Sequence, residues 1–329
     1  MALRANGFQI VPRTEQTMRR QVVAFSVVAV LAASLILNVA RKVRAAGPTF
    51  TTIDFPGAIR TIATAINFSG TIVGDFCSAC TPHEKVHGYI LSQGAFTQID
   101  FPGSGFTRPL GIDDVGNIVG VYKDSKNGMD HGFLLSGDTF TSIDFPGVSQ
   151  THALGIDPAG EIFGGYCSGG NSCYNPGENV HGFMLSGGVF TTIDFPGATF
   201  TEIWRQDRAG QIAGRYQDAN GFFHVFLLSN GSFTTINFPS AAETAPGGFT
   251  VVGGFNAGGD IASGYCSAEP CANPSPSVHS LLLKDGQFTS FDPPASAFGS
   301  VALSVNSLGE IIGTYVGPDG NEHGYLRTQ

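Results

Sequence analysis

The sequence FTTIDFPG, from Phe50 to Gly57, recurs along this 329-residue chain. The later copies are FTQIDFPG, FTSIDFPG, FTTIDFPG, FTTINFPS and FTSFDPPA, and they begin at Phe96, Phe140, Phe190, Phe233 and Phe288. Successive copies start 43 to 55 residues apart. A period of this length is typical of repeat architectures, in which every unit is one small supersecondary motif.

Each repeat has three further short segments ahead of this motif. The first is apolar, as in ALGID (153–157), the second is a GxIxG segment, as in GEIFG (160–164), and the third begins with histidine, as in HGFML (181–185). An Asn/Asp-x-x-Gly sequence between the first two predicts a type I turn closed by a left-handed glycine. The proline after FTxIDF cannot donate to a continuing ladder, so it ends the fourth segment. We therefore expect four antiparallel strands per repeat.

Four strands in a unit of about 45 residues are typical of a β-propeller blade. The repeats begin at Phe50–Phe55 with a lone fourth strand and finish at His323–Gln329 with a third strand that has no fourth. The sequence therefore predicts an all-β, six-bladed propeller over residues 47–329, closed by the N-terminal strand pairing with the last blade. Closure would remove open sheet edges. A solenoid is the alternative, but it needs end caps, and none is visible in the sequence.

These repeats resemble the family of probable extracellular HAF-type repeats. The resemblance covers residues 50–329 and depends on the H-G-F segments, the G-x-I-V-G segments and the I-D-F-P-G segments. It implies an exported bacterial repeat protein and implies no particular activity. Two segments, His224-Val-Phe and His279-Ser-Leu, depart from the pattern in the fourth and fifth units.

Residues 1–46 predict export from the cytoplasm. They carry seven Lys or Arg residues against one acid, and the 19-residue apolar stretch 22–40 follows Arg19 and Arg20. A basic segment before an apolar core is an export signal, and this core, which predicts an N-terminal hydrophobic helix, nearly reaches the length of a membrane span. A cleaved signal peptide and a retained transmembrane anchor both stay open, as do translation starts at Met1 and Met18. In each case the repeats lie on the extracellular or periplasmic side.

The rest of the chain is acidic. It has 10 basic and 25 acidic residues, a net charge of −15. Such a charge argues against nucleic acid or an anionic lipid surface as the partner. We expect a monomer whose partner is an extracellular protein or a glycan.

The six cysteines fall in alternate repeats, at one position between the GxIxG and histidine segments. The pairs are Cys77 with Cys80, Cys167 with Cys173, and Cys266 with Cys271. Close pairs in an exported chain predict disulfides that brace a loop. Zinc is the alternative, because Cys77 and Cys80 have C-x2-C spacing, but no second pair lies near enough to complete a tetrahedral site.

A histidine opens the third strand of every repeat. Two-residue turns such as Gly187-Gly188 separate the third and fourth strands, and counting outward from them pairs each histidine with an acid or amide. The predicted pairs are His87–Asp100, His131–Asp144, His181–Asp194, His224–Asn237, His279–Asp292 and, through closure, His323–Asp54. Directly opposed side chains stabilise a sheet. Six copies of a cross-strand His–Asp or His–Asn contact indicate a structural role and no metal site.

One repeat departs from its siblings in the first strand, which should lie nearest the axis. Arg205 occupies a position that is Ala65, Gly111, Gly155, Gly254 or Ser304 elsewhere, and it follows the only tryptophan, Trp204. Two positions before the Trp column lie Arg108, His152 and Glu202 in neighbouring blades. A cation, an aromatic, a base and an acid at one channel mouth predict a small-ligand site. The alternative is a salt-bridged cluster that only fills the channel neck.

The sequence contains no phosphate-binding loop, nucleophile elbow or zinc-protease motif. No spacing of acidic residues matches a known calcium loop, so we expect no cofactor and treat these residues as turn formers. The first functional hypothesis is therefore a non-catalytic extracellular binding or scaffold module. The second is a carbohydrate-active enzyme, a glycoside hydrolase or lyase, with Glu202 as acid or base at the loop-rich mouth of the channel.

Overall fold

The computed structural model describes residues 47–80, 85–167, 173, 179–207, 209–236, 251–256, 258–268 and 275–329. In these ranges the regular secondary structure consists of 24 β-strands. A search of the same ranges finds no helix of the length and apolar character that a membrane span requires. The predicted export segment at 22–40 and its hydrophobic helix lie outside the described residues.

The strands pair as four sheets of four strands and one sheet of eight, almost entirely antiparallel. Two of the separate sheets are β6 (Thr107–Ile112), β7 (Ile118–Lys123), β8 (Asp130–Ser136) and β9 (Thr139–Ile143), and β10 (Gln150–Ile156), β11 (Ile162–Cys167), β12 (His181–Ser186) and β13 (Val189–Ile193). The other two are β14 (Phe200–Gln206), β15 (Ile212–Gln217), β16 (Phe223–Ser229) and β17 (Ser232–Ile236), and β18 (Val251–Phe255), β19 (Ile261–Cys266), β20 (Val278–Lys284) and β21 (Gln287–Phe291). The chain is therefore a β-propeller with four-stranded antiparallel blades, as the sequence predicts.

The sheet of eight contains the first and last repeats. One set of four is β2 (Arg60–Ile66), β3 (Ile72–Cys77), β4 (His87–Ser92) and β5 (Ala95–Ile99), and the other is β22 (Ser300–Val305), β23 (Ile311–Val316), β24 (Glu322–Thr328) and β1 (Thr49–Ile53). A single parallel bridge from Arg60 to Glu322 joins the two sets. Each set taken alone has the antiparallel pairing of a blade.

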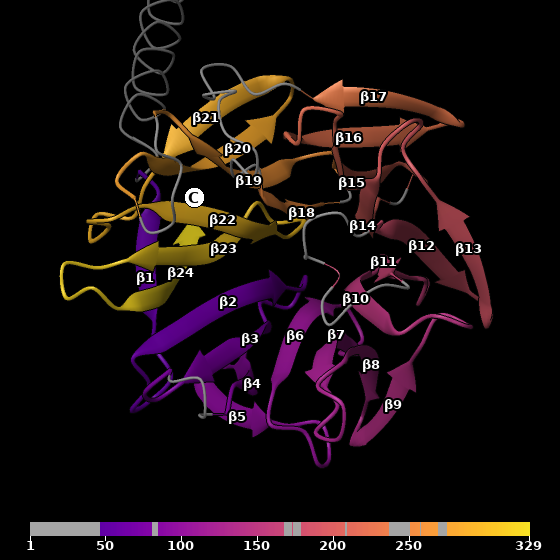
Figure 1. Ribbon diagram of the computed structural model, residues 1–329. Helices are drawn as coiled ribbons and strands as arrows, with labels where there is room; N and C mark the ends of the chain where they lie inside the picture. The colour runs from indigo at the N-terminus through magenta and orange to yellow at the C-terminus, as the bar shows by residue number, and fades with distance from the viewer. Residues whose placement is uncertain are drawn as a thin grey trace, which may run out of the picture. The chain divides into compact units, whose positions relative to one another are not determined.

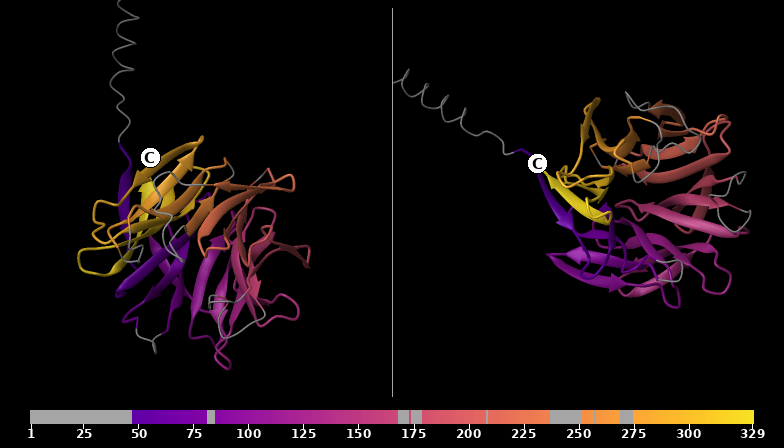
Figure 2. Two further views of the ribbon diagram at one scale, coloured as in Figure 1. Left: turned by 45° about the horizontal axis from the view of Figure 1, so that its top comes forward. Right: turned by 60° about the vertical axis from the view of Figure 1, so that its left-hand side comes forward.

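The N-terminal strand β1 lies beside the last strand, β24 (Figure 2). The ladder runs from Thr49 opposite Thr328 to Ile53 opposite Gly324, and the Thr49 and Thr328 hydroxyl oxygens are 2.6 Å apart. Residues nearly 280 positions apart thus share one sheet. Strand β1 protects the edge that β24 would otherwise expose.

The innermost strand of each set of four lies nearest a common axis, so that β2, β6, β10, β14, β18 and β22 surround it (Figure 1). The small residues of the Arg205 column allow this approach. A Cβ atom added to Gly155 would lie 1.9 Å from the carbonyl oxygen of Trp204, and one added to Gly111 would lie 3.0 Å from the Cα of Gly155. Neighbouring inner strands therefore contact each other backbone to backbone.

The IDFPG motif connects one blade to the next. Ala58 N donates to Phe55 O at 3.0 Å across Pro56 and Gly57, and Gly57 has a φ of 81°, which is a type II turn. The Phe55 ring stacks on Phe76 of the following blade at 3.5 Å. The same stacking joins Phe101 to Tyr122, Phe145 to Tyr166 and Phe195 to Tyr216. The motif is thus a linker that inserts an aromatic ring into the next sheet.

The second glycine of the GxIxG segment makes room for a buried ring. A Cβ atom on Gly74 would lie 2.8 Å from the Tyr89 ring, and Gly120, Gly164, Gly214 and Gly313 have the same relation to Phe133, Phe183, Phe226 and Tyr325. These rings are fully buried. One glycine and one aromatic residue therefore specify the centre of most blades.

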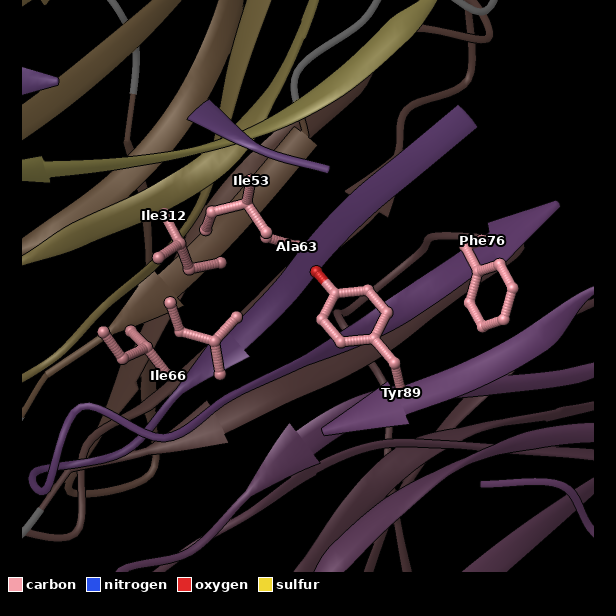
Figure 3. Close-up of a cluster of buried hydrophobic side chains, with 7 residues drawn as sticks. Ile53, Ala63, Ile66, Phe76, Tyr89 and Ile312 are labelled. Atoms are coloured by element: carbon pink, nitrogen blue, oxygen red, sulfur yellow. The ribbon is translucent and has the colours of Figure 1, made fainter. Parts of the chain in front are cut away.

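The core at the junction of the first and last repeats draws residues from both (Figure 3). Ile53 of β1 and Ile312 of β23 pack with Ala63, Ile66 and Tyr89 of the first repeat. The Tyr89 hydroxyl points toward β2, and no described residue forms a hydrogen bond with it. The equivalent Tyr325 hydroxyl lies 2.9 Å from Ser280 Oγ of the neighbouring blade. The two tyrosines thus share a position and differ in a single hydrogen bond.

This difference predicts opposite responses to removal of the two hydroxyl groups. Tyr325→Phe should lower the free energy of unfolding by about 1 kcal/mol, because it leaves Ser280 without one of its partners. Tyr89→Phe should be neutral or stabilising, because it removes a buried group that forms no hydrogen bond. Urea denaturation of both variants measures this. Equal destabilisation by the two substitutions would contradict it.

The closing strand also predicts a pH dependence of stability. His323 Nδ1 lies 2.8 Å from Asp54 Oδ1 and its Nε2 lies 3.2 Å from Asp319 Oδ1. Burial opposes the imidazolium, but these two carboxylates outweigh it and raise the pKa of His323 above 6.5. The stabilisation is complete below pH 6.5 and is lost as the pH rises through the raised pKa. Wild-type thermal stability should therefore fall more than that of His323→Gln between pH 6 and 8. Parallel melting curves would refute the assignment.

Candidate functional site

Every inner strand carries a β-bulge at the same position. The strand register shifts at Ala63/Ala65, Pro109/Gly111, Ala153/Gly155, Ile203/Arg205, Val252/Phe255 and Ala302/Ser304. The residues inside these shifts include Thr64, Leu110, Leu154, Trp204, Gly253 and Leu303, and all six line one cavity. A bulge leaves a residue outside the ladder and re-aims its side chain. The bulges therefore direct this column into the channel.

The axial cavity, lined by these six residues and their neighbours, has a volume of about 290 Å³. Ile62 and Val301 extend its apolar wall. Thr64 is the polar member of the bulge column, and its hydroxyl already donates to Val73 O at 3.0 Å and Pro109 O at 2.8 Å. The middle of the cavity is therefore mainly apolar.

A charged cluster forms one end of the axial cavity. Asp75 is fully buried, and its two oxygens accept hydrogen bonds from Arg60 Nη2 at 2.7 Å and Arg108 Nε at 3.0 Å. Glu322 lies beside them and accepts a hydrogen bond from Thr314 Oγ1 at 3.1 Å. Burial raises the pKa of Glu322, and the hydrogen bond from Thr314 and the charge of Arg60 offset only part of this effect.

Arg205 lies at the opposite end of the axial cavity and also borders a second cavity of about 60 Å³. One Asn or Asp after each inner strand lines this second cavity, namely Asn67, Asp113, Asp157, Asp207, Asn256 and Asn306, and Asp114 lines it as well. These side chains cap the turns that follow the inner strands, as in the 2.8 Å bond from Asn117 N to Asp113 Oδ1. Asn67, Asn256 and Asn306 also donate to the next blade. Arg205 thus separates two parts of the channel.

The structure brings Arg108, Trp204 and Arg205 to the axial cavity, and it does not bring His152 and Glu202 there. Glu202 is fully buried and accepts a hydrogen bond from Arg215 Nε at 2.7 Å. His152 is also buried, with its Nε2 atom 3.4 Å from Asp130 Oδ2. This column faces the preceding blade, where Gly165 leaves space for Glu202. From the same column, Ile62, Arg108 and Val301 do line the cavity.

Sequence reasoning missed the carboxylates of the axial cavity. Asp75 is the cross-strand neighbour of Ile62, and the corresponding residues of the other blades are Val121, Gly165, Arg215, Gly264 and Thr314. Most members of this series are small or apolar, and Asp75, Arg215 and Thr314 are the exceptions, as Arg205 is in its own column. A comparison of the repeats along the second strand would have revealed Asp75, Arg215 and Thr314.

The histidines of the third strands and the described cysteines do not line the axial cavity. The Nδ1 atoms of His87, His131, His181, His279 and His323 lie 2.6 to 2.9 Å from Asp100, Asp144, Asp194, Asp292 and Asp54. His224 instead approaches Asp218 through Nε2 at 3.3 Å, and Asn237 lies outside the described residues. Disulfides join Cys77 to Cys80 and Cys167 to Cys173, which excludes zinc at the first pair. Cys266 is also disulfide-bonded, and Cys271 is not among the described residues.

The fold and the axial cavity define a β-propeller whose channel contains a cavity large enough for a small ligand. No family model matches this chain, and no curated protein matches it. Among solved structures it is similar to the lectin of the fungus Aleuria aurantia, described as a six-bladed β-propeller with a novel mode of fucose recognition. The two chains are 12% identical, the match covers 84% of this chain and 93% of the lectin, and the TM-score is 0.53.

Two further structures are similar at the same level. One is a protein of unknown function from Dyadobacter fermentans, with 8% identity, a TM-score of 0.50 and coverage of 85% of this chain and 98% of that chain. The other is a mutant of AofleA from Arthrobotrys oligospora, with 11% identity, a TM-score of 0.50 and coverage of 85% and 86%. Identities this low establish the propeller fold and nothing about the ligand.

The buried ion pair predicts that Glu202 matters for stability. Glu202→Gln should lower the free energy of unfolding by about 3 kcal/mol, because it leaves the Arg215 guanidinium without its carboxylate. The double variant Glu202→Gln with Arg215→Gln should recover part of this loss, because no uncompensated charge then remains. Chemical denaturation of the three proteins measures both effects. A single variant as stable as wild type would contradict the structural role.

Proposed function

We propose that this protein is an exported, non-catalytic binding module of the HAF-type repeat kind. Its six blades are the four separate sheets and the two halves of the eight-stranded sheet, with β1 completing the last blade. Disulfides in the second-to-third strand loops fit an oxidising location outside the cytoplasm. In this proposal the segment 22–40 directs export, either as a cleaved signal or as a membrane anchor.

The axial cavity is the observation that carries the proposal. It combines an apolar wall built from the bulge residues of six blades with a cation, Arg205, that forms no hydrogen bond or ion pair with another described residue. Mostly apolar pockets with a few polar groups are typical ligand sites. The ligand is a small molecule or the exposed end of a glycan or protein chain. The structural similarity to a fucose-binding lectin is consistent with a binding role and does not identify the ligand.

The alternative is a carbohydrate-active enzyme. Glu202 is unsuited to acid–base catalysis in this cavity, because it is ion-paired and buried away from it. Glu322 and Asp75 are the carboxyl groups of the lining, and the raised pKa of Glu322 suits a general acid. A second carboxylate must act as nucleophile or base, and Asp75 is already engaged by two guanidinium groups. We therefore favour binding.

A glycan array and a panel of chromogenic glycosides, applied to the full-length chain, test this choice. We expect no release of product from any glycoside. Any glycan or small molecule that binds in the cavity should lose at least ten-fold in affinity in Arg205→Ala, which carries the residue found in the first blade. Lys126→Gln, in an exposed turn, is the matched control and should bind normally. Turnover of a glycoside that disappears in Glu322→Gln would favour the enzyme instead.

A further inference from the structure

Arg205 is a cation that borders both cavities of the channel. Its column is otherwise Ala, Gly or Ser, and its Cγ would lie 3.3 Å from a Cβ atom added to Gly155. Desolvation lowers the pKa of Arg205 to about 10, and the charge of Asp114 opposes this only in part. The side chain is therefore still protonated at neutral pH. No described residue offers it a hydrogen bond or an ion pair.

Packing alone does not account for this arginine. A largely desolvated charge that forms no ion pair destabilises the folded state, and the small residues of the other blades fill the same position at no such cost. The guanidinium presents several N–H donors in a planar fork that matches a carboxylate. A ligand anion would supply the missing acceptors.

The charged end of the cavity leaves no free cation for a second negative charge. Arg60 and Arg108 are both engaged by the buried Asp75, and Glu322 lies next to them. A dianion, such as a phosphate monoester or a dicarboxylate that spans the cavity, would bury its second charge beside guanidinium groups that are already paired. Burying a charge without a free partner is unfavourable. Of the two arginines in the cavity lining, Arg108 is paired with Asp75, and Arg205 forms no ion pair with a described residue.

The rest of the lining limits the body of the ligand. Leu110, Leu154, Leu303 and Trp204 form the wall, and the hydroxyl groups of Thr64 and Thr314 are already hydrogen-bonded to protein atoms. A monosaccharide fully enclosed here would bury several hydroxyl groups with few partners, and each would cost free energy. An apolar or aromatic body would instead bury its surface against the wall.

We propose that the axial cavity binds a small organic monocarboxylate whose carboxylate group contacts Arg205 and whose apolar body lies against the bulge residues. This inference rests on the proposed binding function and specifies its ligand class. In this arrangement the uncharged end of the ligand lies next to Asp75 and Glu322. Arg205 is the residue that determines specificity for acids.

Calorimetric titration of the full-length chain with matched acids and neutral analogues tests the inference. The acids are phenylacetate, indole-3-acetate and hexanoate, and the neutral probes are phenylacetamide, indole-3-acetamide and hexanamide. We expect at least one acid to bind at least ten-fold more tightly than its amide. Arg205→Ala should remove this preference, Arg205→Lys should keep part of it, and Lys126→Gln should leave it unchanged.

Thermal unfolding of the ligand-free proteins separates this role from a structural one. Arg205→Ala should melt at or above the wild-type temperature, because it removes an uncompensated charge from the channel. A lower melting temperature together with unchanged binding of the acids would overturn the proposal in favour of a structural role.

Failure of the ligand class differs from failure of the binding function. If amides or array glycans bind in the cavity as tightly as the acids do, and Arg205→Ala has no effect, the carboxylate assignment is wrong and the binding function stands. If no acid, amide or glycan binds the wild-type chain, both proposals are wrong.

Discussion

Backbone contact between neighbouring inner strands is the constraint on which the rest of this structure depends. The inner strands can surround one axis only if they approach each other closely, and Gly111, Gly155 and Gly254 leave no room for side chains between them. The bulge next to each of these positions follows from the same crowding, because it turns the adjacent side chain out of the ladder and into the channel. The close contacts between inner strands thus go together with the bulges whose side chains form the wall of the cavity.

Farther from the axis, the repeat motif makes the contacts that hold neighbouring blades together. In IDFPG, the aspartate pairs with a histidine of its own sheet, the phenylalanine stacks on the next sheet, and the Pro-Gly turn redirects the chain between them. The glycine of GxIxG lets a ring lie at the blade centre. Departures from the motif therefore occur where they do not disturb these contacts. The inner strand is such a place, because its bulge residue faces a cavity and not a neighbour.

The sequence predicted the propeller, the type I turns and the pairing of β1 with β24, because these follow from local patterns and from the two incomplete repeats at the ends. It also predicted Arg205 and Trp204, because comparison of equivalent positions needs no coordinates. It placed His152 and Glu202 at the channel mouth by the same comparison, and the structure buries both between blades. Ile62, Arg108 and Val301 of the same column do line the cavity, whereas His152 and Glu202 contact Asp130 and Arg215 instead. Equivalent positions therefore share a place in the strand, and the charges that lie nearby decide where a polar side chain points.

The repeat period and the turn residues were thus available from the chain alone, since each depends on neighbours in sequence. Only the tertiary structure decided which charges meet. Asp75 lies between Arg60 of its own blade and Arg108 of the next, whereas Arg205 forms no ion pair with a described residue. The physical reason is that ion pairing depends on distances across blades, and these are set by the closure of the ring and not by spacing along the chain.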